Sequence, residues 1–501
     1  MIPSQSKQPA AAEVASLPMA GRDIASLPGP RGWPLVGNLL QLERDRVHYT
    51  VEQWAQRFGP VFRIRLGPTP FLVLADHAAI GAVLRDRPDG FRRPPRLGII
   101  WREMGFSPGV FGANGEAWKR QRRMVMAGFD PAHVRAYVPA LSRVTQRLRQ
   151  RWMLAAQQGL AIDLQGDLMR FTVDAIAGLA FGTEVNTLES DEVVIQHHLD
   201  KIFPAVARRM LAPYPYWRHF KTPADRHLDV AVREVNLAVA GFIHKARARL
   251  ADSAQLSARP ENLLEAMLLA ADAPDSGMDD RDVAGNVLTM LLAGEDTTAN
   301  TLAWMLHLLH QNPTVLGQVQ QEVRNLAAAS GGGPDHVFSH DEIDRLALLE
   351  ACIHETMRLK PVGPLNVLQA LRETQVAGVH VPAGTMLWCV MRHDTLREQL
   401  FADARRFDPA RWMEPDQGDP FATSATSATS AKRVSMPFGA GPRICPGRYL
   451  ALLEMKMAMA MLLNGFDIVS VGVADGSAPR EVLSFTMAPA GLEMRLKMRT
   501  S

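Results

Sequence analysis

One cysteine of this chain stands in a loop rich in glycine and proline, which runs from Phe438 to Gly447 just before a long apolar segment. Glycine and proline at this density fit a backbone that turns sharply and approaches another group closely. A zinc knuckle is excluded, because no cysteine or histidine lies two to four residues from Cys445. The loop therefore predicts that one thiolate binds one metal, and it leaves a packed structural cysteine as the alternative.

The same loop resembles a known signature. Its pattern of Phe438, Gly441, Arg443, Cys445 and Gly447 is similar to the cysteine-ligand loop of the cytochrome P450 family of haem-thiolate monooxygenases. The resemblance implies that Cys445 is the axial ligand of the iron in haem b, with the other loop residues beside the haem. A thiolate ligand pushes electron density onto iron and favours cleavage of the O–O bond.

An acid–base pair precedes this loop. Glu355 and Arg358 are three residues apart in a helical pattern, so their side chains share one helix face. Alone, this spacing indicates a surface ion pair worth less than about 1 kcal/mol. The family carries a Glu-x-x-Arg pair at this place and a third basic residue in a Phe-x-Pro-x-Arg segment, which is Phe407 to Arg411 here. The resemblance implies a buried structural network of Glu355, Arg358 and Arg411 that holds the cysteine loop.

A third motif lies inside a long helical pattern, at 293–298. A glycine such as Gly294 costs about 1 kcal/mol in a helix relative to alanine. Its presence indicates that a flat group packs against the helix at this position, or that a small ligand uses the space of the missing side chain. An ordinary buried face, with threonine hydroxyls bonded to carbonyls one turn earlier, is the alternative. The resemblance implies that Asp296 and Thr297 are the family's acid–alcohol pair, in which the hydroxyl steadies dioxygen and a water while the acid relays protons. Glu295 falls at a variable position and receives no role.

Two further residues suggest an anion site. Trp118 and Arg122 are four residues apart, so an indole N–H and a guanidinium can reach one anionic group. The resemblance implies that this group is a haem propionate and that Arg443 is another propionate partner. The family often has a basic residue near the position of Leu368, which is missing here, and Arg372 lies too far along the chain to replace it.

The amino-acid composition excludes several classes of protein. The chain has 501 residues, a formal net charge of +3 and 47% hydrophobic residues, without the basic stripe that nucleic-acid binding requires. Three cysteines are too few for a disulfide scaffold and indicate a reducing compartment. No apolar run is long enough for a membrane-spanning helix, and the N-terminus lacks the pattern of a secretory signal. We therefore expect a cytoplasmic protein without a transmembrane anchor.

Hydrophobic periodicity and turn residues predict the helices and strands that carry these motifs. Helical patterns cover 45–58, 78–85, most of 118–270, 279–311 and a region opened by a capping box at 339–342, with breaks at Pro131, Pro204 and 213–215. Strand patterns cover 61–66, 71–74 and two segments within 376–390. The fold predicted is mainly α (α+β), with small sheets and many helices enclosing haem. It forms a single domain over 28–501, after a flexible tail over 1–27 and with a mobile low-complexity loop at 422–431.

The resemblance also implies a reaction. Dioxygen and two electrons serve to hydroxylate or epoxidise a small, mostly apolar substrate. We expect no fused reductase, so NAD(P)H supplies electrons through a ferredoxin or flavodoxin with its reductase, and we expect a monomer. The alternatives are a peroxide-driven peroxygenase or isomerase and a non-enzymatic haem sensor. By analogy, substrate contacts fall within 91–111, 202–217, 362–368 and 485–487 and at Met290. Arginines 92, 93 and 96 could meet a carboxylate, although loop arginines are usually solvated.

Overall fold

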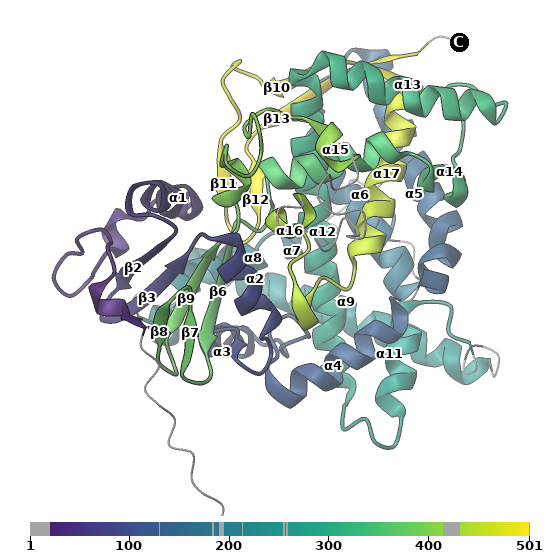
Figure 1. Cartoon of the computed structure of the whole chain (residues 1–501). Helices are drawn as coiled ribbons and strands as arrows, with labels where there is room; N and C mark the ends of the chain where they lie inside the picture. Colours follow the sequence, from purple (N-terminus) through teal and green to yellow (C-terminus); the bar gives the residue numbers. More distant parts are fainter. Residues whose placement is uncertain are drawn as a thin grey trace, which may run out of the picture.

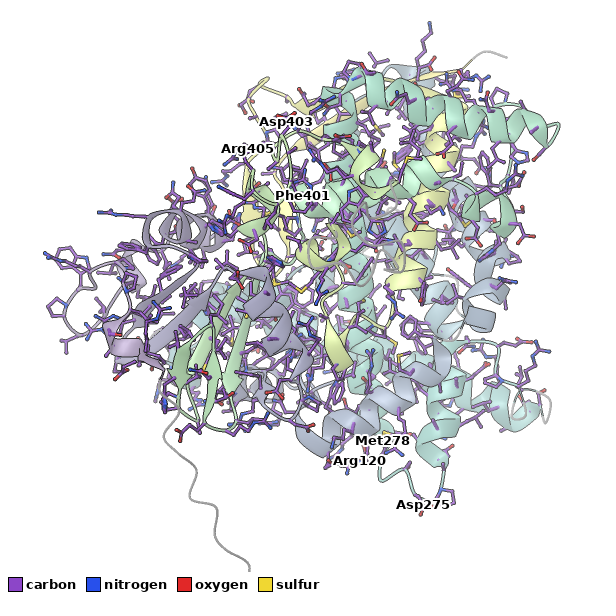
Figure 2. All side chains as sticks on the ribbon, viewed as in Figure 1. Arg120, Asp275, Met278, Phe401, Asp403 and Arg405 are labelled. Carbon is purple, nitrogen blue, oxygen red and sulfur yellow. The ribbon has the colours of Figure 1, made fainter. Side chains whose placement is uncertain are left out.

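The computed structural model describes residues 21–129, 131–182, 185–189, 195–212, 214–253, 256, 259–413 and 431–499. Figure 1 shows the largest sheet at one side of the molecule and most of the helices at the other, with α12 in the middle. Side chains fill the space between these layers (Figure 2). The predicted mainly α fold with small sheets is confirmed.

Sixteen helices are needed to follow the arrangement in the described part of the chain. They are α1 (Val47–Phe58), α2 (His77–Arg85), α3 (Pro95–Glu103), α4 (Gly115–Gly128), α5 (Pro131–Gln158), α6 (Leu164–Phe181), α7 (Ile195–Leu199), α8 (Ile202–Leu211), α9 (Pro223–Asp252), α11 (Leu263–Asp272), α12 (Asp280–Gln311), α13 (Pro313–Ala329), α14 (His340–Asp344), α15 (Ala347–Leu359), α16 (Ala431–Ser435) and α17 (Arg448–Gly465). Short 3-10 turns include η1 (Ile24–Ser26), η5 (Pro409–Trp412) and η6 (Gly441–Arg443).

The strands of the described residues form four small sheets. They are β1 (Arg22–Asp23), β2 (Val61–Leu66), β3 (Thr69–Leu74), β4 (Phe91–Arg92), β5 (Ile162–Asp163), β6 (Leu365–Ala370), β7 (Thr374–Val376), β8 (Val379–Val381), β9 (Met386–Val390), β10 (Phe466–Val473), β11 (Glu481–Leu483), β12 (Met487–Pro489) and β13 (Leu492–Met498). The largest sheet has the order β2-β3-β9-β6-β4, in which only β3 and β9 run parallel. The other sheets have the orders β1-β8-β7, β10-β13-β5 and β11-β12.

The long helix α12 organises the helical side. Its start is fixed by a capping box in which Asp279 and Asp282 satisfy each other's backbone N–H groups. It ends at Gln311, just before Asn312 and Pro313, as expected for a residue that precedes proline. Between these ends it packs against α6, α9 and α15, so most of its length is buried. A motif in its middle is therefore held at the centre of the molecule.

Two sequence-based boundaries differ from the structure, and a third segment falls largely outside the described residues. Residues 22–26 form β1 and η1, with Arg22 opposite Val379 of β8, and Leu27 is only 3% exposed. The folded part therefore begins before residue 28, whereas 1–20 lie outside the described residues. The low-complexity segment 422–431 also lies outside them, apart from Ala431, which opens α16. Pro204 does not break a helix, because it lies in the first turn of α8, where an N–H has no helical partner to lose.

Among the described residues, we find no helix with the length and apolar character needed to span a membrane.

Candidate active site

The cysteine loop joins α16 to α17 and folds back on itself. The Cys445 backbone N–H donates to the Phe438 carbonyl at 2.9 Å. Gly439 and Gly441 have φ of 76° and 71°, a conformation that favours glycine. A Cβ on Gly441 would lie 2.6 Å from the Arg85 Cα, so this glycine also lets the loop approach the end of α2. The predicted close approach of the backbone is thus made to α2.

The environment of the Cys445 thiol contains opposing influences. Burial raises the pKa of the thiol, whereas the Gly447 backbone N–H and the nearby guanidinium groups of Arg122 and Arg448 lower it. Arg122 also donates to the Ile444 carbonyl at 2.8 Å, which fastens the loop to α4. A buried thiolate at this place requires a further positive partner, and a metal ion supplies one.

Four arginines gather beside the loop. Arg443 stacks over the Trp118 ring at 4.5 Å and donates to the Ala113 carbonyl at 2.6 Å, yet its Nε is buried without a hydrogen-bond partner. Arg87 has two such nitrogens and Arg93 has one. Within the described part of the chain, no carboxylate forms an ion pair with Arg87, Arg93, Arg122 or Arg443.

These buried and half-buried cations repel one another. Burial, together with the charges of Arg87 and Arg122, lowers the pKa of Arg443 to about 9. Burial likewise lowers the pKa of Arg87 to about 10 and that of Arg93 well below its ordinary value. Buried charges are normally paired, so the cluster requires an anionic group. Haem carries two carboxylates and an iron atom, and these residues therefore fit it.

This cluster corrects the sequence-based picture of the arginines. Leu368 is buried in β6, and Arg372 instead pairs with Asp86 at 2.9 Å on the surface. Arg93 is not a solvated loop arginine, because its guanidinium lies over the Phe111 ring at 3.5 Å. Arg87 received no role from the sequence. A run of arginines around 85–96 was the only signal, and it does not tell which of them turn inward.

The middle of α12 presents a small accessible face. Ala293 is exposed and Thr297 is half-buried, although most of the helix around them is buried. The Thr297 hydroxyl donates to the Ala293 carbonyl at 2.7 Å, which is the back-bonding that the sequence left as an alternative. A Cβ on Gly294 would lie 3.1 Å from the Ile176 side chain, so this glycine lets α6 pack closely against α12.

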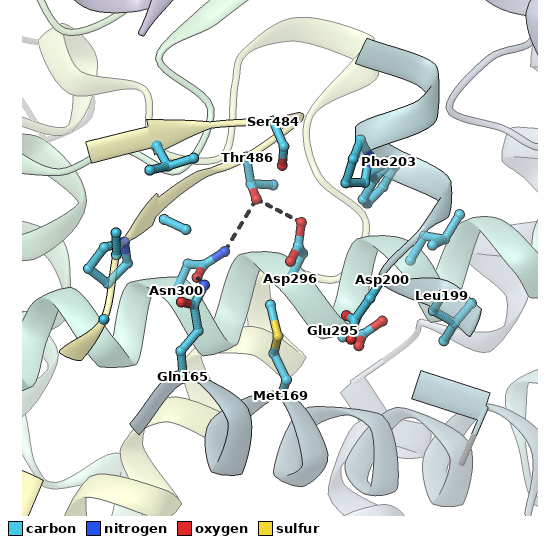
Figure 3. Close-up of a pocket in the computed structure, with 17 residues that line it drawn as sticks. Gln165, Met169, Leu199, Asp200, Phe203, Glu295, Asp296, Asn300, Ser484 and Thr486 are labelled. Atoms are coloured by element: carbon cyan, nitrogen blue, oxygen red, sulfur yellow. Dashed lines mark hydrogen bonds between the residues drawn. The ribbon is translucent and has the colours of Figure 1, made fainter. Parts of the chain in front are cut away.

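Asp296 points to a different neighbour than Thr297 does. The Thr486 hydroxyl, in the turn between β11 and β12, donates to the Asp296 carboxylate at 2.7 Å and accepts from the Asn300 amide at 3.2 Å (Figure 3). Burial raises the pKa of Asp296, and the Thr486 hydrogen bond opposes this. The acid and the alcohol are adjacent in sequence but lie on different sides of α12.

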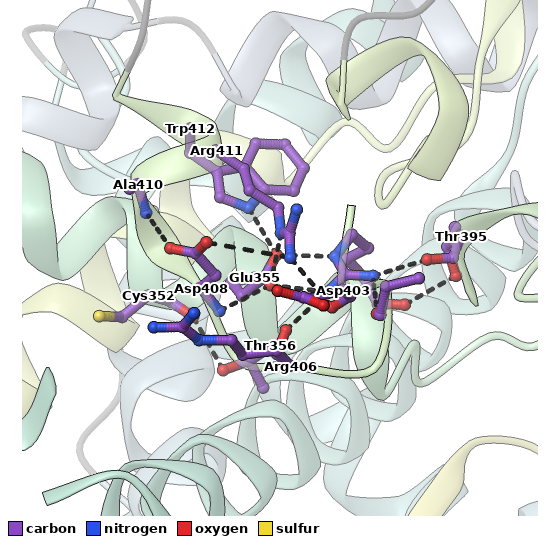
Figure 4. Close-up of polar contacts among 12 residues, drawn as sticks. Cys352, Glu355, Thr356, Thr395, Asp403, Arg406, Asp408, Ala410, Arg411 and Trp412 are labelled. Atoms are coloured by element: carbon purple, nitrogen blue, oxygen red, sulfur yellow. Dashed lines mark hydrogen bonds and ion pairs between the residues drawn. The ribbon is translucent and has the colours of Figure 1, made fainter. Parts of the chain in front are cut away.

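Glu355 and Arg358 form the centre of a buried network (Figure 4). Both side chains are fully buried, and two hydrogen bonds of 2.7 and 2.6 Å join them. Glu355 also accepts from the Trp412 indole at 2.9 Å and from Arg411 at 3.4 Å. The sequence did not single out Trp412 as part of this network. Arg358 donates to the carbonyls of Thr395, Ala404 and Arg406, so the network ties α15 to the segment 395–412.

Three phenylalanines meet near the β11–β12 turn. Phe485 stacks on Phe203 of α8 at 4.2 Å and meets the edge of Phe111 at 5.5 Å. They come from three of the segments that the sequence assigned to substrate contacts. The structure therefore brings these segments together as one aromatic cluster.

Comparison with known proteins agrees with this geometry. The family model described as Cytochrome P450 matches residues 27–494. A flavonoid 3'-monooxygenase of Oryza sativa subsp. japonica is 29% identical over 90% of this chain and 86% of its own length. A cyclooctat-9-en-7-ol 5-monooxygenase of Streptomyces melanosporofaciens is 28% identical over 87% and 88%. A self-sufficient monooxygenase of Oidiodendron maius is 26% identical, and the chain spans only 42% of its length.

Proposed function

The chain belongs to the cytochrome P450 family of monooxygenases, and from this premise we propose that it binds haem b between the Cys445 loop and α12 and oxidises a small, mostly apolar molecule. The observation that carries the proposal is the cluster of buried and half-buried arginines beside the cysteine loop, for which the described residues provide no carboxylate partner. The carboxylates of haem supply the negative charge that this cluster needs. When bound, the haem supplies a site at which dioxygen is reduced and split.

We assign the residues as follows. The Cys445 thiolate holds the iron, while Arg122 and the Gly447 N–H stabilise its charge. Arg87, Arg93 and Arg443 bind the haem carboxylates by charge-assisted hydrogen bonds. Trp118 orients Arg443 by stacking against its guanidinium.

On the α12 side of the site, Thr297 and Asp296 would handle protons. The Thr297 hydroxyl holds a water and a proton on the accessible face of α12. Asp296, with its raised pKa, exchanges protons at a higher pH than an ordinary aspartate. The structural role of Glu355, Arg358 and Arg411 is to keep the segment before the cysteine loop in place.

Substrate and electron donor follow from the surfaces around these residues. The cluster of Phe111, Phe203 and Phe485 favours an apolar substrate, which is hydroxylated or epoxidised. Electrons come from NAD(P)H through a separate ferredoxin or flavodoxin and its reductase, and the enzyme acts as a cytoplasmic monomer. Lys432 and Arg433 are exposed near the cysteine loop and attract an acidic donor. Arg443 does not belong to this docking surface, because it turns inward to Ala113.

The test is a spectrum of the reduced protein with carbon monoxide. Thiolate ligation gives a Soret band at a longer wavelength than histidine ligation does, and Cys445→His should abolish that band. Turnover is then compared with reductase plus NAD(P)H and with hydrogen peroxide alone. Product formation with the reductase system supports the monooxygenase. Product with peroxide alone supports a peroxygenase, rearrangement without either supports an isomerase, and haem binding without turnover supports a sensor.

A further inference from the structure

A cavity of about 410 Å³ lies beside α12, and Thr297 is not among the residues that line it (Figure 3). Residues of α6, α8, α12 and the β11–β12 hairpin line it. Among the described residues that line it, three are acidic, namely Asp200, Glu295 and Asp296, and none is basic. Within the described part of the chain, none of the three acids forms an ion pair. The role proposed above uses only Asp296.

Glu295 is the most unusual of these acids. It is 3% exposed, and its Oε1 has no hydrogen-bond partner among the described residues. Its backbone carbonyl accepts from the Thr172 hydroxyl of α6 at 3.0 Å, which fixes this turn of α12. Burial raises the pKa of Glu295 well above its usual range, and the charges of Asp200 and Asp296 add to this. A neutral carboxyl group at this place can both donate and accept a proton.

Asp200 provides contact with solvent. It lies between α7 and α8, is accessible, and points its carboxyl group toward Glu295 (Figure 3). Burial of its carboxyl end and the charge of Asp296 raise the pKa of Asp200 to about 6, while Lys201 opposes the shift. Asp200 therefore exchanges protons with solvent near neutral pH.

The cavity provides room for water between the carboxyl groups. One water occupies about 30 Å³ of liquid volume, so the cavity has room for several waters. Thr486 and Asn300 add polar groups on its wall, and Thr486 contacts Asp296 directly. Asp296 thus lines the cavity, and Thr297 is the next residue in the chain.

We propose that Asp200 and Glu295 carry protons from solvent through this cavity to Asp296, and so supply the protons that the oxidation consumes. The inference rests on the proposed function. The overall reaction takes substrate, dioxygen, two electrons from the donor and two protons, and gives hydroxylated substrate and water. Each relay step breaks an O–H bond on one carboxyl group or water and forms one on the next. Glu295 gives its proton toward Asp296 and regains one from Asp200.

The experiment uses the haem-loaded enzyme and two substitutions. Glu295→Gln removes the proton carrier at nearly constant shape, and Asp200→Asn removes the solvent-side carrier at an accessible position where folding is not at risk. Glu493→Gln is the matched control, since Glu493 is exposed on β13 and absent from the cavity lining. We measure product formed per NAD(P)H consumed, peroxide released, the solvent deuterium isotope effect on turnover and its dependence on pH.

The expected result is a loss of coupled product formation of about tenfold to hundredfold in Glu295→Gln, with a larger isotope effect and more peroxide. Asp200→Asn should flatten the pH profile near pH 6, and Glu295→Asp should restore part of the activity. In infrared difference spectra, a protonated carboxyl band of the wild-type protein should disappear in Glu295→Gln alone. This readout does not depend on turnover.

Unchanged coupling and isotope effects in both variants, with a normal carbon monoxide spectrum, would overturn the relay. A cation-dependent rise in melting temperature with tetramethylammonium or magnesium, lost in Glu295→Gln, would also overturn it, because the cavity would then be a cation site with ionised acids. Failure of the proposed function can be distinguished from failure of the relay, because the wild-type protein itself would then lack the thiolate spectrum.

Discussion

Glu355 and Arg358 face each other across one turn of α15 with both side chains fully buried, and each oxygen of the Glu355 carboxylate accepts from the Arg358 guanidinium. The remaining guanidinium N–H groups are used by carbonyls between 395 and 406. The pair thus joins α15 to a segment that lies between β9 and the cysteine loop. Its loss should affect the region that leads into the cysteine loop more than α15 itself.

Glu355→Ala should prevent stable haem incorporation. Removal of one partner of a buried pair typically costs about 3–5 kcal/mol, because the other charge stays buried and unpaired. The measurement is the haem-to-protein ratio after purification, together with the melting temperature. Glu373→Ala is the control, since Glu373 is mostly exposed and lies 3.6 Å from His380. A well-folded, haem-replete Glu355→Ala protein would refute the prediction.

Arg93→Met should have opposite effects on the protein with and without haem. Without haem, Arg93 is a half-buried cation whose Nε is buried without a hydrogen-bond partner and whose pKa is lowered by burial and by Arg87 and Arg443, so its removal should stabilise the protein by about 1–2 kcal/mol. With haem, the loss of a charge-assisted hydrogen bond should weaken haem binding by about 1.5–3 kcal/mol. Haem transfer to apomyoglobin and melting of the haem-free protein measure the two effects.

Arg92→Met serves as the control for that experiment, because Arg92 donates to the Gln369 side chain at 2.9 Å and is not one of the unpaired arginines. Equal destabilisation of the haem-free and haem-loaded proteins by Arg93→Met would contradict the proposed role.

The sequence alone could predict those features that local spacing determines. The loop singles out Cys445 as a candidate ligand, and helical spacing puts Glu355 and Arg358 on one face, although the spacing alone predicts a surface pair and only the family resemblance implies the burial that the structure shows. In contrast, the inward orientation of Arg87 and Arg93 depends on how β4 and the end of α2 pack, which one-dimensional spacing does not encode. The reason for Gly294 is similar: its neighbour Ile176 is distant in sequence and belongs to α6. Order at 22–26 also arises from pairing with β8, far along the chain.

Glu454→Gln should change how stability depends on pH. Glu454 is buried in α17, its Oε1 has no hydrogen-bond partner in the described structure, and burial raises its pKa to about 8. Tyr137, whose hydroxyl donates to the Ala175 carbonyl, is the titratable group that senses its charge. Because the folded pKa exceeds the unfolded one, the folded state binds the extra proton, and stability falls as pH rises from about 4.5 through 8.

Glutamine at position 454 cannot ionise, so the variant should lose this part of the pH dependence. The free energy of unfolding of wild type minus variant should decrease by a few kcal/mol between pH 5 and pH 8, on the order of 1.4 kcal/mol per pKa unit. Urea unfolding at a series of pH values measures it. Parallel pH profiles for the two proteins would show that Glu454 does not titrate in this way.

Phe485→Ala should weaken the binding of apolar substrates. Phe485 is the common member of the aromatic cluster, stacking on Phe203 and meeting Phe111 at its edge. Its turn is held by β11, where Arg392 donates to Glu481 at 2.7 Å and also binds Glu52, so the backbone should keep its place when the ring is removed.

Each aromatic pair contributes about 0.5–1.5 kcal/mol beyond area burial, so Phe485→Ala should raise the dissociation constant of an apolar substrate by about tenfold and admit bulkier ones. Spectral titration of the ferric protein measures this. Phe220→Ala, at an exposed aromatic residue outside the cluster, is the control. In the double variant with Phe203→Ala, the loss of binding free energy should be smaller than the sum of the two single losses, since the two rings contact each other. Strict additivity would show that the stack does not act as a unit in substrate binding.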